Sequence, residues 1–240
     1  MSTFRLKLST QLGTSNIHTR AREIASASEI LPQLFLSDYS TVLDVKELSR
    51  LGITHIVSVV AFEPSIPDTI PVNPSSSSTP NKEDDSSSGS GDAGRRVTLQ
   101  RLHIRLEDAP EADLLSHLER TTEWIKRAVE ESKDNKVLVH CLQGVSRSPT
   151  VVCAYLIATT PGPKAMRPNE AIEFVQSKRS VVSPNSGFRK QLEKFGERFV
   201  GNRRKLERNR VPVAPHDSSE ANLVDFVSQA RLEIVEPSSF

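Results

Sequence analysis

The most constraining feature of this sequence is a short β-branched run that a glycine-containing loop joins to a segment apolar on nearly every side. The run is Val137-Leu138-Val139-His140, the loop spans residues 141–146, and the apolar segment extends from Arg147 to about Thr159. β-Branched residues favour strands, and a helix without a polar face must be buried all round. The sequence therefore predicts a strand, a tight loop and a central helix, in that order.

Strands and helices alternate along much of the chain, which is typical of an α/β domain. A strand pair bent at Pro32 is expected first, and a helix capped by Asp38 or Ser40 follows and stops before Gly52. We predict an α/β fold with a central mixed, mainly parallel sheet flanked by helices. The other expected elements are a buried strand at 53–60, a strand at 97–106, a helix at 113–132 capped by Asp113, a helix at 169–176 and a helix from 186 to about 199.

A stretch of serine, glycine and acidic residues interrupts this alternation. Between Asn73 and Gly94 the single apolar side chain is Ala93, so burial cannot offset the entropy of ordering the segment. We expect a disordered insertion inside one domain, because the parts on either side are too small to fold alone. The expected organisation is a disordered tail at 1–27, a domain at 28–202 with the insertion at about 64–95, and a basic, mostly flexible tail at 203–240.

Charge balance and cysteine content argue against several classes of function. Lys and Arg number 31 against 30 acidic residues, a net charge of +1, which disfavours a nucleic-acid or membrane-surface binder. Cys141 and Cys153 are too few for a disulfide framework, and no pattern of Cys and His supplies a set of zinc ligands. No apolar run approaches the ~20 residues that span a bilayer. We expect a monomer in the cytoplasm or nucleus, without a metal or cofactor.

The loop before the central helix has the composition of an anion site. Five residues separate Cys141 from Arg147, so the backbone can curl with successive N–H groups pointing inward at the positive end of the helix. The same N–H groups favour the thiolate of Cys141, the form that can attack phosphorus. The residues expected to bind phosphate are Leu142, Gln143, Gly144, Val145, Ser146 and Arg147.

Side chains around this loop have separate expected roles. Arg147 would hold two phosphate oxygens in its planar fork, and the Ser148 hydroxyl can donate to sulfur as it leaves phosphorus. Gly144 is expected to relieve crowding where the loop passes close to the ligand. His140 is expected to orient the loop by hydrogen bonding rather than to act as a base. The alternative for Cys141 is a small apolar residue that ends a strand before an ordinary turn. Cys153, on the helix, is expected to pack in the core.

The group that leaves phosphorus needs a proton, so an acid is expected on a segment outside the loop. Four carboxylates compete, at Glu107, Asp108, Glu111 and Asp113. Asp113 suits a helix cap, whereas Asp108 comes directly after a predicted strand and before Ala109-Pro110, where a turn would expose it to the pocket. We predict Asp108 as the general acid, and a solvated loop charge is the alternative.

Residues His140 to Ser148 match the His-Cys-x5-Arg-Ser signature of cysteine phosphatases, and flanking segments resemble the dual-specificity branch. The resemblance covers about residues 29–200 apart from the insertion, and it indicates an atypical member. It implies the cysteine phosphatase fold and removal of phosphate from phosphotyrosine and from phosphoserine or phosphothreonine, without a metal, through a phosphocysteine. The flanking matches are residues 29–36, Gly52-Ile53-Thr54-His55-Ile56, Glu107-Asp108-Ala109-Pro110, Ala154-Tyr155-Leu156 and Pro184-Asn185-Ser186-Gly187-Phe188.

Other interpretations stay open at this point. A relative that lacks turnover would bind phosphoproteins only, although such relatives usually lack the Cys or the Arg, and both are present here. Residues 1–22 contain no acidic side chain, which makes a mitochondrial lipid phosphatase a further alternative. The expected partners are phosphorylated proteins. A MAP kinase is a candidate among them, because Arg203-Arg204-Lys205 followed by Val211-Pro212-Val213 resembles a kinase-docking segment; a solvated tail is the alternative.

Overall fold

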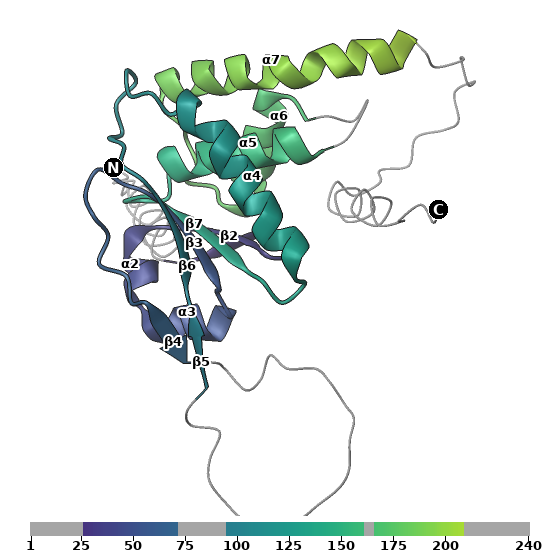
Figure 1. Cartoon of the computed structure of the whole chain (residues 1–240). Coiled ribbons are helices and arrows are strands. Elements are labelled where there is room, and N and C mark those ends of the chain that lie inside the picture. Colours follow the sequence, from purple (N-terminus) through teal and green to yellow (C-terminus); the bar gives the residue numbers. More distant parts are fainter. Residues whose placement is uncertain (1–25, 72–94, 161–165, 209–240) are drawn as a thin grey trace, which may run out of the picture.

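The computed structural model describes residues 26–71, 95–160 and 166–208, which form a layered α/β structure (Figure 1). Five strands build its main sheet in the order β1-β2-β7-β3-β6. β1 pairs antiparallel with β2, and the other three pairs are parallel. This confirms the predicted mixed, mainly parallel sheet. The strands are β1 (Ser28–Leu31), β2 (Leu34–Ser37), β7 (Val137–His140), β3 (His55–Val59) and β6 (Gln100–Ile104).

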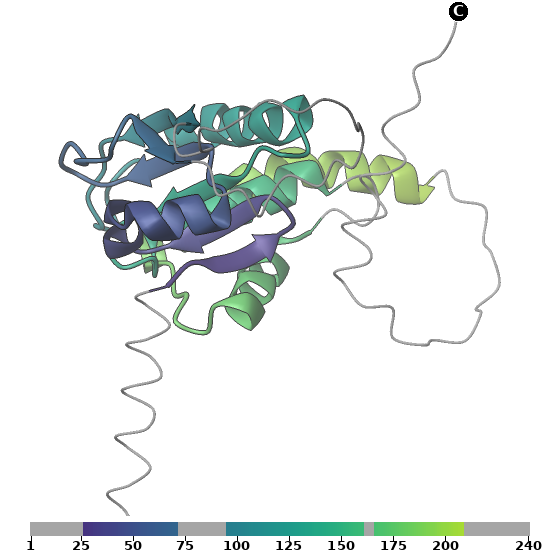
Figure 2. The ribbon, with the colours of Figure 1, turned by 90° about the horizontal axis from the view of Figure 1, so that it is seen from below.

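In the three inner strands β2, β7 and β3, successive side chains enter two different cores, because side chains alternate across a sheet. Val57 and Val59 belong to the larger core, whereas Ile56 between them belongs to the smaller one. Helices lie on both faces of the sheet, and the view from below has α2 and α3 in front of the strands (Figure 2). The larger core is closed by α4 (Leu115–Glu131), α5 (Arg147–Thr159), α6 (Pro168–Lys178) and α7 (Ser186–Arg208), and the smaller one by α2 (Tyr39–Leu43), α3 (Val45–Leu51) and the strands β4 (Thr69–Pro71) and β5 (Arg96–Thr98).

The central helix predicted from its apolar composition is α5, with the predicted bounds Arg147 and Thr159. Every residue from Arg147 to Ile157 is buried. Burial on all sides holds the beginning of α5, and with it the loop that precedes it, in a fixed position. Among the helices in the described part of the chain, none is long and apolar enough to cross a membrane.

Two predicted elements are each divided in the structure. The single helix expected to end near Leu51 is two helices, because the extended Asp44 accepts hydrogen bonds from the N–H groups of Lys46 and Glu47 and so caps a new helix. The strand expected at 97–106 is β5 and β6. They belong to different sheets, and the N–H group of Leu99 between them donates to the Asp68 carbonyl.

Some predicted domain boundaries differ from the structure. The insertion was expected from about residue 64, but Ile66 and Ile70 are buried and β4 pairs antiparallel with β5, so the fold continues to Pro71. The tail expected from residue 203 begins later, because α7 continues to Arg208. The rest of the predicted insertion and tails, at 1–25, 72–94 and 209–240, lies outside the described residues.

The parallel strands bring their carboxyl ends together at one edge of the sheet. His140, the last residue of β7, is in register with Ser37 of β2 and with Ser58 of β3. The segment that follows β6 leaves the sheet at the same edge and leads to Asp108. In open α/β sheets this edge is where ligands bind, and here it carries the loop that begins with Cys141.

Candidate active site

The loop at residues 141–146 wraps its backbone around the sulfur of Cys141. This side chain is 1% exposed, and the Gly144 N–H donates to its Sγ at 3.2 Å. α5 begins directly after the loop, and the Ser146 side chain makes no capping hydrogen bond at its N-terminus. The first N–H groups of α5 therefore remain as donors for an anion at the positive end of the helix dipole.

The surroundings of Cys141 favour its ionised form. Burial on its own raises the pKa of the thiol, but the hydroxyl and N–H of Ser148 and the charge of Arg147 act in the opposite direction, with a smaller contribution from the Gly144 N–H. Together they hold the pKa of Cys141 below the usual value for cysteine. The loop thus favours the thiolate, which is the form of cysteine that acts as a nucleophile.

Ser148 and Arg147, the first two residues of α5, carry buried donors that lack a good acceptor. In the described part of the chain, neither the Ser148 hydroxyl nor Arg147 Nε makes a hydrogen bond of good geometry. The hydroxyl is close enough to the Cys141 sulfur to lower the pKa of the thiol, and Nε lies 3.5 Å from Asp108 Oδ2. The Ser148 hydroxyl is free to donate to the sulfur. Arg147 Nη1 donates to the Leu106 carbonyl at 3.1 Å, which fixes the guanidinium. Its Nε has an ion-pair contact with Asp108 but no hydrogen bond, so it can still donate to a ligand oxygen.

Gly144 is required by the loop for a reason beyond the predicted one. It has φ +68°, a left-handed conformation that glycine adopts without strain. A Cβ at this position would lie 2.6 Å from the Ser37 carbonyl oxygen and 2.9 Å from Arg179 Nη2. The crowding that glycine relieves in this structure is with the end of β2 and with Arg179.

His140 supports the loop from below, in line with its predicted role. Its Nδ1 is 3.2 Å from the Cys141 carbonyl oxygen, which can only accept, so this nitrogen carries the hydrogen. Nε2 then accepts from the Ser58 hydroxyl at 2.7 Å. Burial lowers the pKa of His140 to about 4, so the ring is neutral near pH 7 and orients the loop without a charge.

Asp108 lies beside the loop, where a general acid would have to be. Its Oδ1 accepts from the Ser146 hydroxyl at 2.7 Å and from Asn185 Nδ2 at 2.9 Å, and its Oδ2 is 3.5 Å from Arg147 Nε. The side chain is 35% exposed, so a substrate can reach it. Ser146, predicted as a phosphate-binding residue, uses its hydroxyl to hold this carboxylate, and only its backbone remains for phosphate.

The other carboxylates and the second cysteine lie elsewhere. Asp113 accepts from the Ser116 N–H at 3.1 Å, so it caps the start of α4 as predicted, and Glu107 and Glu111 are exposed. Cys153 is fully buried in the larger core, and its burial raises the pKa of the thiol. Cys153 is therefore a packing residue, as predicted.

Sequence reasoning did not find the residues that hold the loop and the acid in place. Asn185 donates to Asp108, and its Oδ1 accepts from the Phe188 N–H at the start of α7. Arg179 is fully buried and donates from Nε to the Gly144 carbonyl at 3.2 Å and from Nη1 to the Ser26 carbonyl at 2.8 Å. Asn185 could have been found as a helix cap at the head of a predicted helix. Nothing in the sequence around Arg179 predicts a buried arginine.

We predict that Asn185→Ser lowers kcat by about tenfold, because serine keeps the helix cap but is too short to hold Asp108. The thermal unfolding midpoint should change little. In a double-mutant cycle on aryl phosphate hydrolysis, Asn185→Ser should cause little further loss once Asp108 is alanine. Fully additive effects of the two substitutions would show that Asn185 does not act through Asp108.

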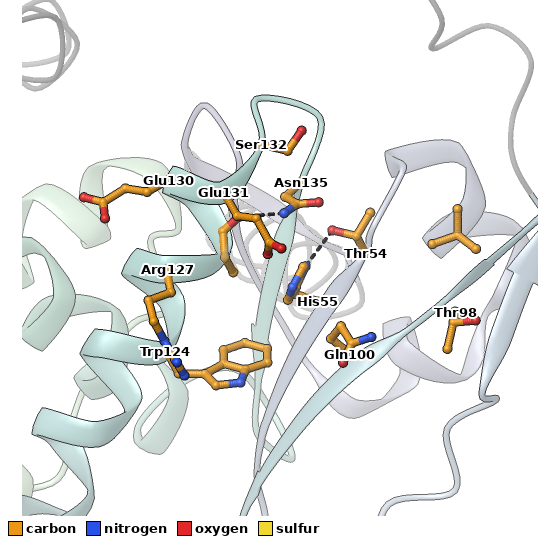
Figure 3. Close-up of a pocket in the computed structure, with 12 residues that line it drawn as sticks. Thr54, His55, Thr98, Gln100, Trp124, Arg127, Glu130, Glu131, Ser132 and Asn135 are labelled. Carbon is orange, nitrogen blue, oxygen red and sulfur yellow. Dashed lines mark hydrogen bonds between the residues drawn. The ribbon is translucent and has the colours of Figure 1, made fainter. Parts of the chain in front are cut away.

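The cavity shown in Figure 3 lies at the opposite edge of the sheet, where β3 and β6 begin, and has a volume of about 1000 Å³. The rings of His55 and Trp124 meet edge to face in its wall, with centroids 5.3 Å apart. Burial lowers the pKa of His55, and the charge of Glu131 partly opposes this. None of the predicted site residues lines this cavity, so it is separate from the candidate active site.

A mainly parallel sheet with a cysteine in an anion-binding loop and an arginine at the start of the next helix defines the class of cysteine-dependent phosphatases. The family model described as dual specificity phosphatase, catalytic domain, matches residues 34–198. The chain belongs to this family.

Relatives and solved structures agree with this assignment. The chain is 31% identical over 175 residues to dual specificity protein phosphatase 22 of Xenopus tropicalis, and 47% identical over 92 residues to dual specificity protein phosphatase 5 of Rattus norvegicus. These matches span 72% and 38% of this chain, but 66% and 22% of the relatives' lengths. A human tyrosine phosphatase-like serine/threonine/tyrosine-interacting protein has a similar structure, with a TM-score of 0.55, 27% identity, and coverage of 73% of this chain and 99% of that one.

Proposed function

We propose that this chain hydrolyses phosphotyrosine and phosphoserine or phosphothreonine on proteins through a phosphocysteine intermediate. The observation that carries the proposal is the loop at the start of α5, in which the Gly144 N–H donates to the buried Cys141 sulfur at 3.2 Å. The lowered pKa of Cys141 agrees with this geometry. Membership of the dual specificity phosphatase family supports the same reaction.

In the first half of the reaction the Cys141 thiolate attacks phosphorus, an S–P bond forms, and the bond from phosphorus to the substrate oxygen breaks. Arg147 Nε and the N–H groups of the loop bind the non-reacting phosphate oxygens. Asp108, held by Ser146 and Asn185, gives its proton to the leaving oxygen. The products are the dephosphorylated side chain and a phosphocysteine.

In the second half a water molecule attacks phosphorus, and Asp108, now a carboxylate, takes a proton from this water. The S–P bond breaks and releases inorganic phosphate. The electron pair returns to the sulfur, where the Ser148 hydroxyl and the Gly144 N–H stabilise the thiolate. His140 stays neutral throughout and takes no proton.

The nature of the loop supports a substrate with a single phosphate on a protein side chain. Leu142, Gln143 and Val145 carry no positive charge, so the loop offers no cation for a second phosphate. A MAP kinase as substrate, and a location in the cytoplasm or nucleus, remain predictions. Of the candidate docking segment, Arg203-Arg204-Lys205 lies on α7, and Val211-Pro212-Val213 lies outside the described residues.

The proposal is tested with Asp108→Ala and a series of aryl phosphates whose phenols differ in acidity. Without its acid, the enzyme should lose about 10²-fold or more in kcat on substrates with a poor leaving group, and much less when the phenol is acidic. Phosphopeptides containing phosphotyrosine or phosphothreonine should both be hydrolysed by the unmodified protein.

The same assays separate the proposed enzyme from a module that only binds phosphoproteins. Such a module would bind the phosphopeptides and release no phosphate from any substrate. An equal loss across the whole aryl phosphate series would show that Asp108 is not the acid.

A further inference from the structure

Three large hydrophobic side chains are exposed in the described part of the chain: Leu43, Phe62 and Leu142, at 47%, 40% and 49%. They come from three segments, namely α2, the loop after β3 and the catalytic loop. Isolated exposed hydrophobic residues are common and need no explanation, but a group of them beside a ligand site indicates a contact surface.

Tyr39 lies close to the three segments that carry these side chains. Its ring meets Phe62 edge to face with centroids 5.1 Å apart, and its N–H donates to the Leu142 carbonyl at 3.1 Å. Leu43 lies one helical turn after Tyr39 on α2, so both side chains project from the same face of this helix. We call Tyr39, Leu43, Phe62 and Leu142 the apolar rim.

Tyr39 anchors the apolar rim beside the loop at residues 141–146, which we call the phosphate cradle. Tyr39 stacks on the His140 ring with centroids 5.8 Å apart, and its hydroxyl accepts from the Ser65 N–H at 3.3 Å. Leu142 directly follows Cys141, so one edge of the rim borders the point where phosphate would bind. In a peptide whose phosphorylated side chain reaches Cys141, the Cα atoms of the adjacent residues lie about 3.8 Å from that of the phosphorylated residue. These adjacent residues must therefore lie over the entrance to the cradle.

We propose that the apolar rim selects substrates in which a hydrophobic residue lies next to the phosphorylated one. This inference rests on the proposed phosphatase function and names its substrate class. An acidic neighbour would meet the apolar rim and would gain no ion pair from Leu142 or Gln143. A leucine or phenylalanine would instead remove apolar surface of both partners from water.

The test compares two phosphotyrosine peptides that differ only in having leucine or aspartate on both sides of the phosphotyrosine. We expect kcat/KM to be about tenfold higher for the leucine peptide. Phe62→Ser and Leu43→Ser should each reduce this preference several-fold, while hydrolysis of a small aryl phosphate stays within about twofold of the unmodified protein, because neither residue belongs to the cradle. Val97→Ser, in the cavity at the other edge of the sheet, is the matched control and should keep the full preference.

The outcomes separate this inference from the function on which it rests. Equal kcat/KM for the two peptides, or a preference that both serine variants retain, would contradict substrate selection by the apolar rim. The proposed phosphatase function would not be affected by either result. If neither peptide nor the aryl phosphate were hydrolysed, the proposed phosphatase function itself would be contradicted. Concentration-dependent self-association that Phe62→Ser abolishes, together with no peptide preference, would assign the rim to a second copy of the chain and contradict the proposal.

Discussion

Replacing Cys141 with serine is expected to lower the rate of aryl phosphate hydrolysis by about 10⁴-fold or more, the scale of effect seen when a hydrolase loses its nucleophile. A serine hydroxyl does not ionise near neutral pH, so the loop would hold no nucleophile. Serine is close to cysteine in size, so the variant should fold although Cys141 is buried. It should also still bind phosphopeptides. Hydrolysis and peptide binding should be measured on the same preparation.

Cys153→Ala provides the matched control for this experiment. Cys153 lies on α5 in the larger core and touches no part of the proposed chemistry. Its replacement should reduce the thermal unfolding midpoint, because it leaves a small cavity, and leave kcat within about twofold. If Cys141→Ser kept activity near that of the Cys153→Ala control, Cys141 would not be the nucleophile.

Arg147→Lys is expected to lower kcat/KM by about 10³-fold, although the positive charge is kept. Arg147 combines a fork of donors with a fixed position, since Nη1 is bound to the Leu106 carbonyl and Nε has no hydrogen-bond partner in the described structure. Lysine has a single ammonium group, which can neither hold two phosphate oxygens in a plane nor keep the contact to Leu106.

This variant separates the two effects of Arg147, on the thiolate and on the phosphate. Because lysine keeps a charge near the sulfur, alkylation of Cys141 near neutral pH should persist while hydrolysis collapses. Arg147→Met, which removes the charge as well, should impair both. Hydrolysis by Arg147→Lys within about tenfold of the unmodified protein would contradict the role of the fork.

Much of the fold was predictable because it is encoded by local patterns. The β-branched run before Cys141 and the uniformly apolar segment after Arg147 specify β7 and α5, and the order of polar and apolar residues fixes where the loop must be. Asp113 was predictable as a cap, because it precedes an amphipathic segment. The split of the first helix at Asp44 was missed because a cap inside a continuous helical pattern is a weak signal.

The support of the site was harder to predict because it depends on contacts between distant parts of the chain. Arg179 reaches the Gly144 carbonyl across 35 positions, and Asn185 reaches Asp108 across 77. The approach of Ser37 to Gly144 was missed because it arises from the pairing of β2 with β7, which no local pattern reveals. Local sequence thus predicted which residues meet at the loop, and tertiary contacts decide how firmly they are held.

The most direct test is the pH dependence of Cys141 alkylation in the Cys153→Ala background, where one thiol remains. A lowered pKa means that thiolate is present at lower pH, so the alkylation rate should reach half its maximum clearly below the ordinary cysteine pKa of about 8.5. Ser148→Ala should move this midpoint upward, because it removes a donor to the sulfur. A midpoint at or above 8.5 in the parent protein would mean that the loop does not hold Cys141 ionised, and the proposed reaction would have no nucleophile.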